Sequence, residues 1–219
     1  MKVDMHVHTV YSGDSRNSVQ DILDACARVG MDGVVVLDHN TLRGGSEAVA
    51  MKSGILVIPG IEVSTADGHV LALNVNAEIP RDLSVEETID RIHAQGGVAV
   101  AAHPYRVWSG LGESKVYGRK FDAIECQNGR STRHGNHKAM ALAEEMGKAR
   151  TGGSDSHEPE TIGKAYTVLP EGCTDADAVM KALLSGKATT EGSDRDVKAT
   201  VRYGKKTITE WVGRGMKRM

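Results

Sequence analysis

Short runs of β-branched and aliphatic residues recur along the chain, and segments with helical spacing of apolar residues separate them. The clearest runs cover residues 34–37, 55–63, 98–102 and 165–169. Buried strands that alternate with amphipathic helices are typical of parallel strands joined by crossover helices. The hydrophobic pattern therefore predicts an α/β fold.

The expected helices carry sequence signals at their ends. Ser18 with Asp21 forms a capping pair that opens one helix, and Ser84 with Glu87 opens another. The expected helices cover 19–29, 85–95 and 134–147, with a further helix that begins near Thr174. Apolar residues in the 134–147 helix form one stripe, which we interpret as core packing rather than a cofactor site.

Chain length and composition predict one domain with a substantial core, since 40% of the 219 residues are apolar. We divide the chain into a domain over residues 1–190 and a basic C-terminal extension over 191–219. From residue 194 onward eight basic residues face three acidic ones. Such a charge run is usually a solvated surface, so we favour a packed or solvated extension over a nucleic-acid patch. Residues 105–120, rich in Gly and Ser, predict a functional loop.

The charge balance and the cysteine spacing limit which cellular compartment and which binding partners we expect for this protein. The 29 acidic and 27 basic residues nearly balance, so net charge gives no reason to expect a polyanionic partner. The three cysteines are widely separated, which argues against a disulfide framework or a thiolate zinc site. The N-terminal sequence has no apolar signal segment, and no run of about 18 apolar residues follows. We expect a cytoplasmic protein without membrane association.

Histidines and acidic residues fall repeatedly where a predicted strand ends. His6 and His8 follow the first strand, and Asp155 and His157 follow a Thr-Gly-Gly segment. Residues i and i+2 of a strand point to the same side, so each pair can bind a common ion. Other strand-end candidates are Asp38 with His39, Glu62 and His103. One His-x-His pair could equally be two ordinary histidines, but the repeated clusters favour metal ligands in a barrel active site.

The ligand types indicate which metals the cluster would bind. Imidazole and carboxylate ligands without thiolate suit Zn, Mn or Fe. A catalytic ion takes about three protein ligands, and this chain offers more than one ion can bind. We therefore expect a multinuclear site.

Short motifs follow one another in a fixed order along the chain. They are Asp4-Met5-His6-Val7-His8-Thr9, Ser12-Gly13-Asp14, Leu37-Asp38-His39-Asn40, Gly60-Ile61-Glu62-Val63-Ser64, His69-Val70-Leu71, Ala102-His103-Pro104-Tyr105-Arg106 and Gly153-Ser154-Asp155-Ser156-His157. This set resembles the PHP family, the polymerase and histidinol phosphatase superfamily, from residue 1 to about residue 170. Related amidohydrolases also begin with His-x-His, but the Gly-Ile-Glu and final Asp-x-His motifs resemble PHP proteins.

The resemblance implies a distorted seven-stranded β/α barrel, similar to a TIM barrel, with three divalent transition-metal ions. By the family pattern, His6, His8, Glu62 and Asp155 bind the first ion, Asp14, His39 and His157 the second, and Glu62, His69 and His103 the third, with Glu62 bridging. The surroundings of Asp14 depart from the usual Ser-x-Asp-Gly, and the context of His69 also fits a turn residue. Asp38 and Asn40 are interpreted as groups that orient His39.

Such ions would activate water and hold phosphate oxygens, and further cations would balance charge in the transition state. Arg106, directly after the His103 motif, is the best-placed cation, with a surface arginine as the alternative. Asn128 either contacts substrate or caps a turn. The expected substrate-binding residues are Arg106, Asn128, Arg130 and Arg16, and the expected catalytic residues are Arg106, Asp14 and His157.

Three functions fit these observations. The favoured one is hydrolysis of a small phosphomonoester, such as a nucleotide, a sugar phosphate or histidinol phosphate. The second is a DNA or RNA exonuclease or a phosphodiesterase that uses the same ions, with the basic C-terminal residues as its specific support. The third is a non-catalytic binding barrel, which the costly convergence of polar ligands argues against. The expected partner is a small phosphorylated substrate, and the oligomeric state stays open.

Overall fold

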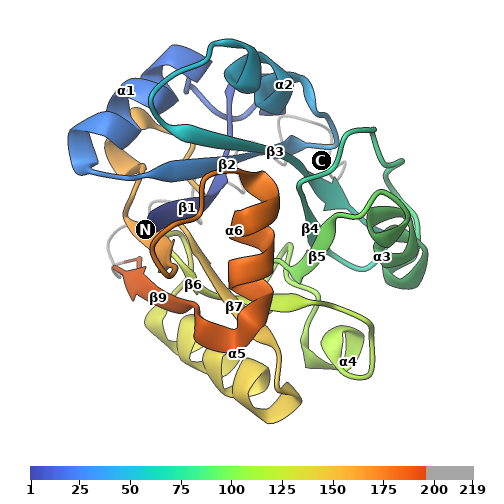
Figure 1. Cartoon of the computed structure of the whole chain (residues 1–219). Coiled ribbons are helices and arrows are strands. Elements are labelled where there is room, and N and C mark those ends of the chain that lie inside the picture. Colours follow the sequence, from blue (N-terminus) through green and yellow to red (C-terminus); the bar gives the residue numbers. More distant parts are fainter. Residues whose placement is uncertain (196–219) are drawn as a thin grey trace.

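Nine strands form one continuous sheet, in sequence order, in the part of the chain that the computed structural model describes, residues 1–195. They are β1 (Lys2–Val7), β2 (Gly33–His39), β3 (Leu56–Ser64), β4 (His69–Leu73), β5 (Val98–Ala101), β6 (Ala123–Asn128), β7 (Ala149–Gly153), β8 (Ala165–Val168) and β9 (Thr189–Gly192). Because β8 also pairs with β1, strands β1 to β8 close into a barrel, and β9 extends the sheet beside β8 (Figure 1).

Helices connect and surround the strands. They are η1 (Val10–Ser12), α1 (Val19–Val29), α2 (Arg43–Ala50), α3 (Val85–Ala94), α4 (Glu113–Val116), α5 (Arg133–Met146), η2 (Pro159–Thr161), α6 (Ala176–Ala182) and η3 (Leu183–Lys187). The predicted capping boxes open α1 and α3, since Ser18 and Ser84 each exchange hydrogen bonds with the acidic residue three positions on. The N-cap of α6 is Asp175 rather than Thr174. In the described part of the chain, no helix is both long and apolar enough to cross a membrane.

The TIM-barrel-like α/β class predicted from the sequence is confirmed, with eight barrel strands where the resemblance implied seven. Strands β1, β2 and β3 are parallel, as are β5, β6 and β7. However, β4 and β8 run antiparallel to both of their barrel neighbours. The prediction that residues 165–169 form a parallel strand was therefore wrong. A parallel return needs a long crossover, usually an α-helix, and only the short η2 lies between β7 and β8.

Three apolar clusters form around the sheet. The first lines the barrel with alternate residues of the strands, such as Met5, Leu37 and Leu71, and includes Val179 and Leu183 from α6 and η3. The others pack α1 and α2, and α3 and α5, against the outer faces of the strands. In Figure 1, α6 lies across the opening of the barrel. This end is therefore covered by apolar side chains, and polar groups gather at the carboxyl ends of the parallel strands.

The predicted basic extension, 191–219, lies mostly outside the described residues. Its first residues complete β9 and contact the barrel, since Asp194 accepts hydrogen bonds from Gln127 and Asn136. The division at residue 190 stays a prediction. Residues 105–120, predicted as a loop, contain the short α4.

Candidate metal centre

Glu62, near the end of β3, lies at the middle of the histidine cluster. Five ring nitrogens face its two carboxylate oxygens. They are His69 Nδ1 at 2.7 Å, His103 Nε2 at 3.0 Å, His39 Nδ1 at 3.1 Å, His8 Nε2 at 3.2 Å and His6 Nε2 at 3.5 Å. Glu62 is 1% exposed, so no water layer separates it from these rings. A carboxylate in this position can bridge ions, as the family pattern implied.

A register shift in β1 turns His6 towards the centre. Asp4 pairs with Val34 and Val7 with Val36, so β1 has one more residue than β2 over this stretch. Met5 faces the barrel interior and Val7 packs outwards, which leaves His6 and His8 on the interior side. A β-bulge next to an active site commonly re-aims a side chain in this way.

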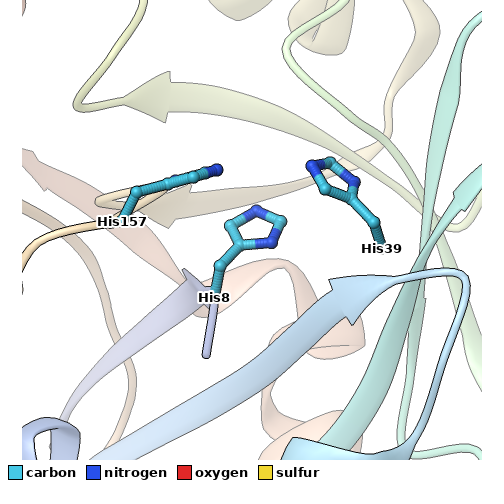
Figure 2. Close-up of side chains that lie close together, drawn as sticks. All are labelled: His8, His39 and His157. Carbon is cyan, nitrogen blue, oxygen red and sulfur yellow. The ribbon is translucent and has the colours of Figure 1, made fainter. Parts of the chain in front are cut away.

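The other predicted ligands lie around the same point. His8, His39 and His157 point towards one another in Figure 2. Asp14 lies 3.1 Å from His157 Nε2 and 3.8 Å from His39 Nε2. Asp155 Oδ1 lies 3.5 Å from His8 Nε2. Candidate ligand atoms lie within 4.8 Å of one another in three sets: His6, His8 and Asp155; His8, His39 and His157; and His39, Glu62 and His69.

Burial and neighbouring charges shift the pKa values of the residues in this cluster strongly. Burial raises the pKa of Glu62 and Asp155, but the nearby histidines and, for Asp155, Arg106 outweigh it and hold both pKa values well below usual. Burial lowers the pKa of His8, but hydrogen bonds to Asp155 and Glu62 raise it to about 9. Burial lowers the pKa of His103 and His157 to about 4, so both rings are neutral near neutral pH and keep a lone pair for an ion.

The donor set fits divalent cations. His6 Nε2 and His8 Nε2 face each other at 3.0 Å, with Glu62 and Asp155 beside them. Asp14 Oδ1 is buried and has no hydrogen-bond partner among residues 1–195. Converging lone pairs and carboxylate charges in a buried place need positive charge between them. Neutral imidazole and carboxylate oxygen are ligands for Zn, Mn and Fe.

Ser12 is a supporting residue that the sequence interpretation missed. Its hydroxyl donates to Asp38 Oδ1 at 2.7 Å and lies 2.9 Å from His8 Nδ1. Ser12 donates its only hydroxyl proton to Asp38, so its oxygen must accept the Nδ1–H of His8. The Nε2 of His8 then faces the centre of the cluster. Asp38 was expected to orient His39, and its carboxylate contacts Thr9 and Ser12. The Ser12 oxygen also accepts the backbone N–H of His39 at 3.1 Å, so Asp38 acts through Ser12 on both His8 and His39. The Ser-x-Asp motif itself was the available signal.

Arg106, Asn128 and Arg130 surround Asp155. Arg106 donates to Asp155 Oδ2 at 2.6 Å and to Asn128 Oδ1 at 2.7 Å, and Arg130 lies 3.3 Å from Asp155 Oδ1. An extra residue in β6 between the pairs Glu125–Thr151 and Gln127–Gly152 turns Asn128 inwards. Arg16 is exposed, and its backbone N–H donates to His157 O at 2.9 Å. Three of the four predicted substrate-binding side chains thus lie together, and the Arg16 guanidinium does not contact them in the described structure.

The sequence matches the PHP domain profile over residues 4–149 and a PHP-associated profile over residues 133–188. An uncharacterized protein of Methanocaldococcus jannaschii is 38% identical over 141 residues, which cover 58% of this chain and 82% of that protein.

Solved structures share the fold at low sequence identity. A two-domain protein from Bacteroides vulgatus, described as containing a predicted PHP-like metal-dependent phosphoesterase, superposes with a TM-score of 0.71 at 19% identity. The match covers 88% of this chain and 64% of that one. A lesion-specific endonuclease from Pyrococcus furiosus has a TM-score of 0.68 at 16% identity, over 88% of this chain and 59% of its own.

Proposed function

The chain belongs to the PHP domain family and is a metal-dependent hydrolase of phosphate ester bonds, and we propose that its substrate is a small phosphomonoester. Candidate substrates are nucleotides, sugar phosphates and histidinol phosphate. Water would attack phosphorus, and the ester oxygen would leave as an alcohol, which yields inorganic phosphate. We propose the cytoplasm as its compartment, since its widely separated cysteines suit a reducing environment.

The two guanidinium groups beside the predicted ligands carry this proposal. Arg106 and Arg130 both pair with Asp155, and their side chains are 10% and 25% exposed. They are therefore within reach of an incoming group. Guanidinium groups match the geometry of phosphate oxygens and are well suited to stabilise charge that develops on them. Asn128 Oδ1 accepts from both the Arg106 side chain and the Arg130 backbone, so it holds the pair in place.

The depth of the centre favours a monoester. His6, His8 and Glu62 are at most 1% exposed, and the more open ligands, such as His157 and Asp14, have side chains that are 11% and 21% exposed. A terminal phosphate can enter such a recess alone. An internal phosphodiester must bring the chain on both sides with it, which needs a more open site.

We propose three divalent ions, from Zn, Mn or Fe, held by the nine predicted ligands. The residues are His6, His8, Glu62 and Asp155 for the first, Asp14, His39 and His157 for the second, and Glu62, His69 and His103 for the third. When bound, such ions activate water near neutral pH and neutralise charge on phosphate oxygens. The protein itself orients the substrate through Arg106 and Arg130. Asp14 and His157, with side chains that are 21% and 11% exposed, would hold the second ion on the side from which the substrate approaches.

A nuclease or phosphodiesterase is the second candidate. The basic residues after position 194 favour it, and the barrel is shared with the endonuclease from Pyrococcus furiosus. Fold alone does not determine the substrate, so both candidates go into one experiment.

The test is a parallel assay of phosphate monoesters, bis-p-nitrophenyl phosphate and a single-stranded oligonucleotide with protein loaded with Mn²⁺ or Zn²⁺. His8→Ala removes a central ligand, and His93→Ala is the matched control because His93 pairs with Asp122 outside the centre. We expect phosphate release from monoesters that His8→Ala abolishes and His93→Ala retains. Turnover of the diester or oligonucleotide alone would favour the second candidate, and no turnover of any ester would refute both.

A further inference from the structure

Glu125, in β6, is a buried carboxylate that contacts two of the predicted ligands, His6 and His103. Its Oε1 lies 2.8 Å from His6 Nδ1, and its Oε2 accepts the backbone N–H of His103 at 2.8 Å. Glu125 is 1% exposed, and its carboxylate lies on the opposite side of the His6 ring from Glu62. Both oxygens are thus committed to residues of the metal centre.

We propose that Glu125 is the positioning residue of the centre, which fixes the ring of His6 and the backbone of His103 with one carboxylate. A carboxylate only accepts, so His6 must carry its proton on Nδ1 and present the Nε2 lone pair to the ion. This inference rests on the metal centre and is independent of which ester is the substrate.

The backbone of His103 explains why the second contact matters. His103 follows β5 with a φ of 25°, a conformation that side-chain-bearing residues rarely adopt. The alternation of β5 places Ala102 inside the barrel and would direct the next side chain outwards. The hydrogen bond from the His103 N–H to Glu125 stabilises the unusual backbone that instead turns the ring to Glu62, 3.0 Å away.

Glutamine at position 125 has nearly the same shape but cannot serve both contacts. If its oxygen faces His6, its NH₂ group meets the N–H of His103. If its NH₂ group faces His6, the ring proton must move to Nε2, where it blocks the ion. Either orientation disrupts one of the two contacts, so the conservative change tests the role of the carboxylate.

Asp122 provides a chemically matched control. It accepts from His93 Nε2 and from the backbone N–H of Ala99, each at 2.8 Å, beside the opposite end of β5. Asp122→Asn therefore removes a carboxylate charge that, like Glu125, contacts one histidine ring and one backbone N–H, but these partners lie outside the metal centre.

The experiment measures the stoichiometry and affinity of Mn²⁺ and Zn²⁺ by calorimetry and elemental analysis, together with the rise in Tm that each metal gives. We expect Glu125→Gln to weaken binding of at least one ion by about 10- to 100-fold and to reduce the metal-induced rise in Tm. Asp122→Asn should retain the wild-type affinity. Wild-type affinity and stoichiometry in Glu125→Gln would overturn the proposal.

A second measurement needs no variant and covers the case in which Glu125→Gln does not fold. Nitrogen-15 spectra of the histidine rings in the Zn²⁺-loaded wild type should show His6 protonated on Nδ1, and a proton on Nε2 would refute the proposal. If the wild type binds metal as described but hydrolyses no ester, the proposed function fails while the role of Glu125 stands.

Discussion

At the scale of single residues, the charge of the histidines predicts how metal binding depends on pH. The Asp155 and Glu62 carboxylates raise the pKa of His8 to about 9 against its burial, so the metal-free protein holds a proton there near neutral pH. An ion at Nε2 must displace that proton. We expect affinity for Zn²⁺ or Mn²⁺ to rise with pH up to about 9, and calorimetry in buffers of different ionisation enthalpy to detect proton release. A pH-independent affinity would contradict this.

The raised pKa of His8 also predicts how the stability of the metal-free protein depends on pH. Because the folded pKa of His8 lies above its ordinary 6.5, His8 stabilises the metal-free fold fully below that pH and loses this contribution as pH rises through about 9. Bound metal replaces the proton. Denaturant titrations should therefore show a larger loss of stability at alkaline pH for metal-free than for metal-loaded protein.

At the scale of elements, the packing of β7 against β1 depends on a glycine. A Cβ on Gly153 would lie 2.4 Å from the Cβ of His6 and 2.7 Å from its backbone nitrogen. Gly153→Ala should cost about 1–3 kcal/mol in the free energy of unfolding, because strands must separate to admit the methyl group. Gly54→Ala is the control, since a Cβ added there would meet nothing within 4 Å and the φ of Gly54 is not left-handed. Equal urea midpoints for the two variants would be inconsistent with this packing.

The loop after β5 carries an exposed indole, Trp108, next in sequence to a residue that contacts the backbone of His69. Trp108 is 77% exposed, although its neighbour Ser109 accepts the backbone N–H of His69 at 3.0 Å. Adjacent Cα atoms are about 3.8 Å apart, so the Trp108 backbone lies close to that of His69, one of the predicted ligands. If the substrate is a phosphomonoester, Trp108→Ala should lower kcat/KM for p-nitrophenyl phosphate by up to about tenfold, because the indole no longer stacks on the nitrophenyl ring. It should leave glycerol phosphate and Tm nearly unchanged, and an equal loss on both esters would contradict a stacking role.

The sequence was most informative where a local pattern fixes the geometry. His-x-His and Asp-x-His pairs share a side of extended chain, and the capping boxes of α1 and α3 depend on residues three positions apart. The extra residues in β1 and β6 depend on pairing with distant strands, so Asn128 was predicted as a candidate from its place at a strand end, but the bulge that turns it inwards was not. Glu125 was missed for the same reason, because its partner His6 is 119 positions away.

At the scale of the whole molecule, all nine predicted metal ligands and the Arg106–Arg130 pair lie within residues 1–195, while seven of the eight basic residues after position 194 follow Arg195. A chain ending after Arg195 therefore separates the two candidate functions. If the substrate is a small phosphomonoester, metal content and kcat/KM should match the full chain. If the substrate is a nucleic acid, loss of these charges should weaken oligonucleotide binding and reduce its dependence on salt, because fewer counterions are released. Comparing both proteins at low and moderate salt measures this difference, and a truncated chain that loses monoester hydrolysis while keeping its ions would place a substrate-binding group among residues 196–219.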